Sequence, residues 1–141
     1  MYKDNIHMFI VSALAKIPYL KGCSDETLHM IAYSMKNENL ESERMIFGPG
    51  DRSICMILIY SGTVEISTKM DSGTEFAVEK ATRGTVINST SFLFEEALEL
   101  SAKTTKPVNM YVIDKLKFLS IVGKDEKLLK RLEKEISNQI E

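Results

Sequence analysis

Apolar side chains recur with helical spacing near the start of the chain. They predict a helix over residues 2–15, because they fall on one face at Ile6, Phe9, Ile10, Ala13, Leu14 and Ile17. Pro18 is expected to end or kink this helix at the preceding residue. Ser24 has the chemistry of an N-cap, so a second helix is predicted from Asp25 to about Met35.

The last part of the chain has the same helical spacing. Asp114 is expected to cap a short helix that ends near Val122, where Gly123 stops it. Residues 125–140 form the final predicted helix, whose apolar stripe consists of Leu128, Leu129, Leu132, Ile136 and Ile140.

The middle of the chain changes to the spacing of β-strands. Short apolar or alternating runs, separated by turn residues, predict strands over residues 39–41, 45–47, 55–60, 63–67, 74–80 and 108–113. Ser61-Gly62 indicates a tight hairpin, and further along Phe76 and Val78 alternate with glutamates. Strands at such close spacing favour a small antiparallel barrel or jelly roll.

These elements together predict an α+β fold with helices on both sides of a β-roll. We expect a single domain over residues 1–141, with N-terminal helices in 1–36, the β-roll in 37–113 and C-terminal helices in 114–141. An internal helix is predicted inside the roll at about residues 90–100. A chain of 141 residues is long enough to bury a sizeable core.

Composition excludes some classes of function. The formal net charge of −2 gives no electrostatic reason to expect nucleic acid as a partner. No apolar stretch reaches membrane-spanning length, so this segment is expected to make no direct membrane contact. Cys23 and Cys55 show neither a disulfide framework nor metal-ligand spacing, which favours a reducing, cytoplasmic compartment.

The histidines argue against catalysis by a metal or a nucleophile. His7 and His29 are the only two, and both lie on predicted helices outside the roll. A metal enzyme built on a β-roll needs several histidine and carboxylate ligands that converge inside the barrel. We therefore expect no metal, no cofactor and no enzymatic activity.

Residues 84–100 interrupt the strand pattern. They begin as a glycine-led loop and are predicted to end as a helix, an arrangement that often holds a phosphate. This segment has no arginine, and Glu95, Glu96 and Glu99 place carboxylates where an anion would lie. The pattern leaves open whether the segment is a phosphate site, a former one or an ordinary turn.

The order of elements and several motifs resemble the cyclic-nucleotide-binding domain family. "IPYLKGCSDETLHMIAYSM" is similar to the family's entry helices, and "YVIDKLKFL" to its exit from strand to helix. "IFGPGD" and "MILIYSGTVEI" are similar to its central strands. The resemblance covers roughly residues 10–136 and implies a regulatory β-roll domain that takes cAMP or cGMP.

In that family a phosphate-binding cassette lies between the last two β-elements. Its glycine, backbone N–H groups and arginine receive the cyclic phosphate, and its glutamate binds the ribose 2′-hydroxyl. The resemblance places the candidate pocket at Gly84, Ile87, Asn88, Ser89, Thr90, Leu98 and Glu99.

All three ligand-contacting positions carry other residues in this chain. Asn88 stands for the glycine, Ser89 for the glutamate and Leu98 for the arginine. Glu99 adds a charge that opposes a phosphate. The basic residues considered as replacements are Lys80, Arg83, Lys103 and Lys106.

The final helix has two interpretations. It can simply cover the domain, or it can be the lid that closes over the ligand in the resembled family. Leu129, Leu132 and Ile136 are the candidate lid residues. The apolar repeat is too short to predict a coiled coil.

The resemblance implies a regulatory domain of a larger protein, with nucleotide binding weakened, atypical or lost. The entry helices are most similar to those of cation channels and sodium/proton exchangers. The chain is therefore expected to be an intracellular part of such a membrane protein, with the host's other domains as partners. A kinase regulatory chain is a less favoured host, and a transcription factor is disfavoured because no helix-turn-helix follows within this chain. Two alternatives stay open: a functional cAMP or cGMP sensor with non-standard phosphate contacts, and a ligand-free protein-interaction module.

Overall fold

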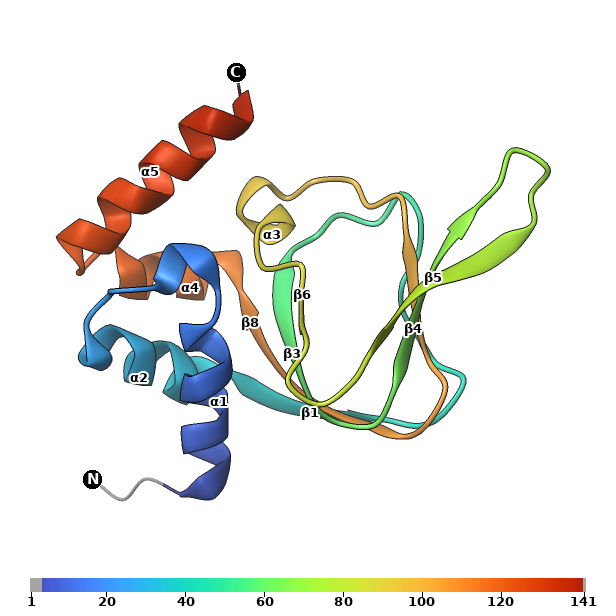
Figure 1. The fold of residues 1–141 in the computed structure, drawn as a ribbon, viewed down its shortest axis with the longest axis horizontal. Coiled ribbons are helices and arrows are strands. Elements are labelled where there is room, and N and C mark those ends of the chain that lie inside the picture. Colours follow the sequence, from blue (N-terminus) through green and yellow to red (C-terminus); the bar gives the residue numbers. More distant parts are fainter. Residues whose placement is uncertain (1–3, 141) are drawn as a thin grey trace. The chain divides into compact units, whose positions relative to one another are not determined.

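A computed structural model describes residues 4–140, without the side chains of Ile136, Asn138, Gln139 and Ile140. The chain forms two compact units (Figure 1). The β unit comprises Lys36–Asp114, and the helical unit comprises the chain up to Met35 and from Lys115 onward. The described residues contain no helix that is both long and apolar enough to cross a membrane.

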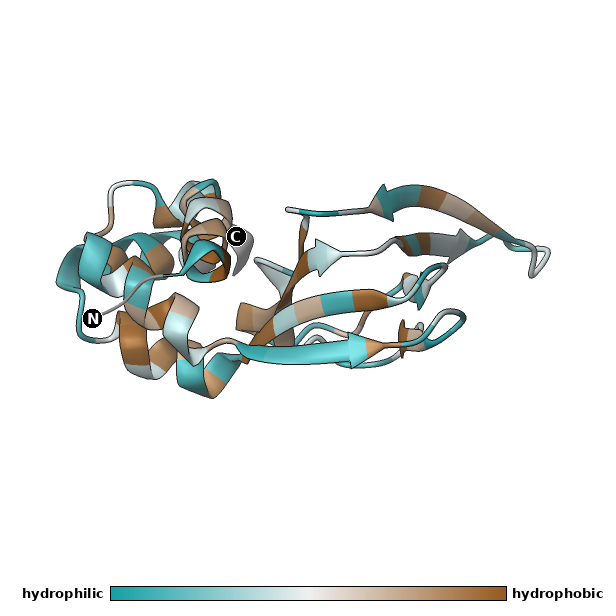
Figure 2. Cartoon of the chain, turned by 90° about the horizontal axis from the view of Figure 1, so that it is seen from below, coloured by the Kyte–Doolittle hydropathy of each residue, from teal (hydrophilic) through white to brown (hydrophobic). Residues whose placement is uncertain are grey.

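In the residues that the structure describes, the helical unit has four α-helices and one 3-10 turn. They are α1 (Asn5–Ala15), η1 (Pro18–Leu20), α2 (Asp25–Ser34), α4 (Lys115–Val122) and α5 (Glu126–Ile140). Figure 2 shows hydrophobic and hydrophilic bands on the same helices, as amphipathic helices require. Their buried faces form a core that includes Ile10, Leu14, Leu20, Ile31, Phe118, Leu128 and Leu132.

Side-chain caps begin the first two long helices. The Asp4 carboxylate accepts a hydrogen bond from the backbone N–H of His7 at 2.7 Å. The Ser24 hydroxyl accepts one from the backbone N–H of Thr27 at 3.1 Å, which confirms Ser24 as the N-cap of α2. Each cap satisfies a donor that the first helical turn leaves without a partner.

Asp125 ties the start of α5 to α2. Its carboxylate accepts hydrogen bonds from the backbone N–H of Leu128 at 3.1 Å and from the Thr27 hydroxyl at 2.8 Å. Both bonds favour the charged form, so they lower the pKa of Asp125, the Leu128 N–H most strongly. In the same unit, burial and then Glu135 raise the pKa of Tyr19.

The β unit is a roll of two four-stranded antiparallel sheets. One sheet has the order β1 (Lys36–Leu40), β8 (Val108–Asp114), β3 (Cys55–Ser61), β6 (Val86–Ile87). The other has the order β2 (Met45–Phe47), β7 (Ser101–Thr104), β4 (Val64–Lys69), β5 (Glu75–Ala81). Its apolar core consists of Ile57, Ile59, Val64, Ile66, Ala81, Ile87, Ala102, Val108 and Met110. The predicted α+β fold with a β-roll and flanking helices is confirmed.

The hairpin predicted at Ser61-Gly62 is wrong in one respect. A turn is present, but β3 and β4 belong to different sheets and do not pair. Gly62 has φ +97°, and a Cβ there would lie 2.3 Å from the carbonyl oxygen of Pro107. Only glycine fits this crossing between the sheets.

The predicted internal helix is shorter than expected. Instead of residues 90–100, α3 comprises only Ser91–Phe94 and ends where Glu95 takes the left-handed conformation with φ 49°. The chain then runs into β7, a strand that the sequence pattern did not predict. Its sequence, Ser-Ala-Lys-Thr, lacks the β-branched apolar residues that signal a buried strand.

Candidate functional site

Two cavities border the segment from Gly84 to Glu99, called the cassette below. The cassette cavity, about 540 Å³, is lined by Phe47, Ile66, Glu79 and residues of 85–88 and 96–100. The roll cavity, about 580 Å³, is lined by residues of β1, β2, β3, β8 and the loop before β3, together with two cassette residues. Phe47, Asn88 and Leu98 line both cavities.

The structure brings only part of the predicted pocket together. Ile87, Asn88, Leu98 and Glu99 all line the cassette cavity. The other three predicted residues, Gly84, Ser89 and Thr90, line neither this cavity nor the roll cavity. The site assignment taken from the resemblance stays a prediction. Only the four residues that line the cassette cavity lie around a common space.

Backbone geometry sets the entry to the cassette. Gly84 has φ +90°, and its N–H donates to the carbonyl of Ile59 at 2.8 Å. β6 then pairs with β3, which carries the chain to Asn88. Asn88 has φ 63°, a left-handed conformation in which asparagine is the commonest substitute for glycine. The position assigned to the family's glycine therefore keeps a glycine-like backbone.

The single turn α3 is built into the core. Phe92 and Leu93 are buried, with exposed fractions of 0% and 5%. The Ser91 hydroxyl lies 2.9 Å from the hydroxyl of Ser53, a residue that is itself buried. Thr90 precedes the turn and makes no capping hydrogen bond with its side chain. With four residues and this packing, α3 serves as a structural turn.

The exit from the cassette is paired with the loop before β3. Main-chain hydrogen bonds join Gly50 N–H to Leu98 O at 2.7 Å, Leu98 N–H to Asp51 O at 2.8 Å, and Ser53 N–H to Glu96 O at 2.8 Å. Glu95 and Glu96 therefore follow the helix, whereas the predicted helix of residues 90–100 would have contained them. This pairing places Glu96 in the wall of the cassette cavity.

The cassette cavity is acidic. Glu79, Glu96 and Glu99 line it, and no lysine or arginine is among its lining residues, all of which the structure describes. Glu79 reaches it through a β-bulge: the register of β4 with β5 shifts between Ile66 and Ser67, so that Glu79 lies opposite the core residue Ile66. The simple alternation of β5 predicted the opposite face for this glutamate.

The basic residues considered as replacements lie elsewhere. Lys103 forms an ion pair with Glu43 at 2.7 Å, and that hydrogen bond raises the pKa of Lys103. Arg83 donates to the carbonyl of Tyr60 at 3.1 Å, and its guanidinium lies 4.5 Å from the centre of the Tyr60 ring. Neither these two nor Lys80 and Lys106 line the cassette cavity or the roll cavity.

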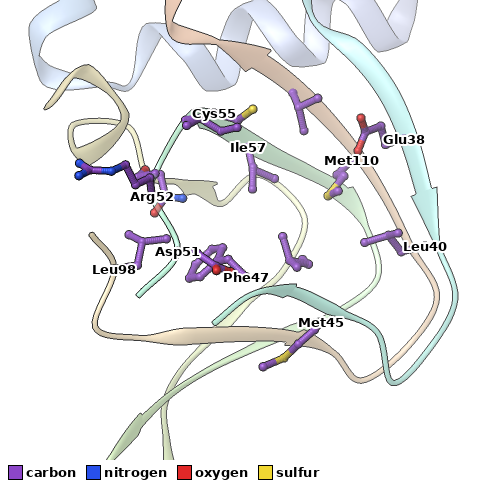
Figure 3. A pocket seen from close by; sticks show the side chains of 15 residues that line it. Glu38, Leu40, Met45, Phe47, Asp51, Arg52, Cys55, Ile57, Leu98 and Met110 are labelled. Carbon is purple, nitrogen blue, oxygen red and sulfur yellow. The ribbon is translucent and has the colours of Figure 1, made fainter. Parts of the chain in front are cut away.

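Arg52 is the basic residue that sequence reasoning missed. It lines the roll cavity and donates from Nη1 to the carbonyl of Glu95 at 3.1 Å. Figure 3 shows Arg52 and Leu98 on one side of that cavity, with Met110 and Leu40 on the other. No local motif marks Arg52, because its position depends on the pairing of its loop with the cassette exit.

The remaining wall of the roll cavity is largely apolar and contains one thiol. Burial, followed by the charges of Asp114 and Glu38, raises the pKa of Cys55. The thiol is therefore neutral at pH 7. Among the described residues, no group of three or more histidines, cysteines and carboxylates has the arrangement of a metal site.

Comparison with known proteins identifies the family. The family model described as "Cyclic nucleotide-binding domain" matches residues 37–125. The chain belongs to this family. Its members are typically non-catalytic regulatory modules. A search of curated proteins gave no significant match.

Solved structures of regulatory proteins share the fold at low sequence identity. The regulatory domain of Toxoplasma gondii PKA, solved with cAMP, is 15% identical with a TM-score of 0.77, over 92% of this chain and 49% of that one. The N-terminal domain of a transcriptional regulator from Streptomyces coelicolor A3(2) is 14% identical with a TM-score of 0.78, over 91% of both chains.

A third structure is the regulatory subunit of a cAMP-independent protein kinase A from Trypanosoma cruzi, bound to guanosine. It is 21% identical with a TM-score of 0.69, over 83% of this chain and 41% of that one. This chain thus spans less than half of the two kinase regulatory chains. At these identities the likeness shows the fold, and the ligand has to be argued from the site.

Proposed function

We propose that this cyclic nucleotide-binding domain is a regulatory module of a larger protein in which binding of cAMP and cGMP is weakened or lost. The observation that carries the proposal is the acidic cassette cavity. Three carboxylates line it, no basic side chain does, and Leu98 stands where the resemblance places the phosphate-binding arginine.

The magnitudes support this proposal. Losing a charge-assisted hydrogen bond to a phosphate costs about 1.5–3 kcal/mol, or roughly 10- to 100-fold in affinity. A carboxylate about 6 Å from the phosphate opposes it by about 3 kcal/mol at an effective dielectric near 20. Glu99, the neighbour of Leu98, contributes this repulsion in addition to the missing arginine.

We propose that both units together form one regulatory domain over residues 1–141, with the host's other domains as partners. The relatives named above are a transcriptional regulator and kinase regulatory chains. They lend no support to the expectation of a channel or exchanger host. The lid assignment also stays a proposal: Leu132 is buried and Leu129 half-buried within the helical unit, and the side chain of Ile136 lies outside the described residues.

Isothermal titration with cAMP and cGMP tests the loss of nucleotide binding. We expect no binding tighter than a Kd of about 100 μM for either nucleotide. A Kd in the low micromolar range would overturn the proposal and favour a functional sensor with non-standard phosphate contacts. Absence of every small ligand would favour the ligand-free interaction module.

A nucleoside without phosphate is the second candidate ligand. The carboxylates of Glu79, Glu96 and Glu99 accept hydrogen bonds from hydroxyl and amino groups, and they do not repel an uncharged molecule. The relative from Trypanosoma cruzi is described as cAMP-independent and bound to guanosine. Separate titrations with guanosine and with cGMP check this candidate. It requires guanosine to bind at least about tenfold more tightly than cGMP.

A further inference from the structure

The core of the β-roll is incompletely covered at one place. Five hydrophobic residues pack against the buried core but stay partly exposed: Leu40, Ile46, Phe47, Cys55 and Val112. All five line the roll cavity, together with the buried core residues Ile57 and Met110. The exposed edge of the core and the wall of this cavity are therefore the same surface.

The polar groups on the cassette side of this cavity already have partners. The Asp51 carboxylate accepts from the N–H of Gly48 at 2.8 Å. The Ser53 hydroxyl is bonded to that of Ser91, and Arg52 donates to the carbonyl of Glu95. The described residues contain no buried side-chain nitrogen or oxygen without a hydrogen-bond partner. No buried polar side-chain atom of this wall therefore requires a polar ligand.

The charges along the wall disfavour an anion. Glu38 and Asp51 bring two carboxylates, against the single guanidinium of Arg52. Figure 3 shows that guanidinium pointing away from Met110 and Leu40, which form the opposite wall. An anionic head group would meet net negative charge, whereas an uncharged molecule meets a largely apolar surface without this repulsion.

We propose that the roll cavity binds a small, uncharged, apolar molecule. Its volume of about 580 Å³ lies within the range of about 300–1,000 Å³ that is usual for small-molecule pockets. The ligand covers the five partly exposed hydrophobic residues and removes their surface from water. This site goes beyond the proposed function and does not depend on what the cassette cavity holds.

Fluorescence of the neutral probe N-phenyl-1-naphthylamine tests the proposal on the full chain. We expect saturable enhancement that 1-decanol reverses. Decanoate has the same number of carbon atoms but carries a charged carboxylate in place of the CH2OH group, and it should compete at least about tenfold less well. The proposal would be overturned if decanoate competed as well as decanol or better, and if the Arg52→Gln variant lost this competition. The cavity would then bind an anionic amphiphile.

A matched pair of variants locates the probe. Val112→Phe places a larger side chain in the cavity wall and should weaken probe binding at least about tenfold. Val78→Phe makes the same exchange on β5, at a half-exposed residue that lines neither cavity, and should leave binding within about twofold. Equal effects of the two variants would overturn the assignment.

Methionine methyl NMR of the unmodified chain gives a second measurement, independent of whether Val112→Phe folds. Met45 and Met110 line the cavity, whereas Met8, Met30 and Met70 do not. Decanol should shift the first two signals and leave the other three in place. Shifts spread over all five, or none, would overturn the proposal.

Competition by nucleotides keeps the two proposals apart. If guanosine displaces the probe, the roll cavity belongs to the nucleoside candidate and the inference fails. If micromolar cAMP binds without displacing the probe, the proposed loss of nucleotide binding fails and the apolar site stands. If decanol does not bind, only the inference fails.

Discussion

The cassette cavity and the roll cavity share Phe47, Asn88 and Leu98, yet their chemistry is opposite. Three glutamates give the first an acidic wall, whereas the second is bounded by the uncovered edge of an apolar core. The same short segment therefore serves two kinds of surface. The difference comes from side chains that other strands and loops bring to each cavity, and the cassette backbone alone does not determine what either one binds.

The largest expected effect is on the stability of the β-roll that carries both cavities. Gly62→Ala places a Cβ 2.3 Å from a carbonyl oxygen at φ +97°, so we expect a loss of about 3 kcal/mol or more in the free energy of unfolding. Gly73→Ala is the control, because Gly73 has a similar φ of +89° but no atom within 4 Å of the added Cβ. It should cost only about 1–2 kcal/mol. Urea denaturation measures both, and equal losses would contradict the steric argument.

The next effect reverses the chemistry of the cassette cavity. Leu98→Arg with Glu99→Ala supplies a guanidinium and removes the adjacent carboxylate, so affinity for cAMP should rise about 100-fold or more. Titration calorimetry measures the gain. Glu95→Ala with Leu98→Arg is the matched control, since Glu95 lines neither cavity and its removal leaves Glu99 in place. If the Leu98→Arg, Glu99→Ala variant binds cAMP no better than the parent, these two positions do not account for the loss of nucleotide binding.

A smaller effect concerns Asn88, which lines both cavities. Asn88→Ala should lower stability by about 1 kcal/mol, because alanine tolerates φ 63° less well than asparagine does. Asn88→Gly should cause no loss, since glycine adopts this conformation without strain. Thermal unfolding compares the two. If glycine destabilises as much as alanine, the amide side chain and not the backbone conformation is what matters there.

The smallest effect lies outside both cavities and depends on pH. The pKa of Asp125 is lowered in the folded state, so its carboxylate stabilises the fold above the unfolded pKa of about 3.9. This contribution is lost as the pH falls through the lowered folded value. Asp125→Asn should therefore be less stable than the parent at pH 7, and the two should converge in acid.

Denaturation midpoints measured from pH 7 down to pH 2 check this prediction. Probe binding in the roll cavity at pH 7 should be unchanged in Asp125→Asn, since Asp125 belongs to the helical unit. A stability difference that persists at the lowest pH would show that the asparagine acts through something other than the carboxylate's charge.

Local signals sufficed for most of the fold. Ser24 predicts the start of α2 because a cap acts within one helical turn. The apolar run that became β3 and the short strand β2 were predicted within a residue or two, because their neighbours are turn residues. Sequence motifs on both sides of the cassette supported the assignment to the cyclic nucleotide-binding domain family, and the family model confirms that assignment.

What the sequence could not provide depends on pairing between distant segments. β7 is a strand because β2 and β4 flank it, and its sequence, which lacks β-branched apolar residues, gave no sign of this. Glu79 faces the core residue Ile66 because of a bulge that breaks the alternation. Arg52 lines a cavity because its loop pairs with the cassette exit. All three features depend on how two distant segments pair, and the sequence of one segment alone does not specify that pairing.

Three of the hydrogen bonds that pair the cassette exit with the loop before β3 join main-chain atoms. Gly50, Asp51 and Ser53 hold Glu96 and Leu98 through N–H and carbonyl groups that every residue other than proline possesses. The side chains of Glu96 and Leu98 can thus change without removing these three bonds. The scaffold can exchange one ligand for another over evolutionary time while its shape persists, so that recognition and architecture vary independently.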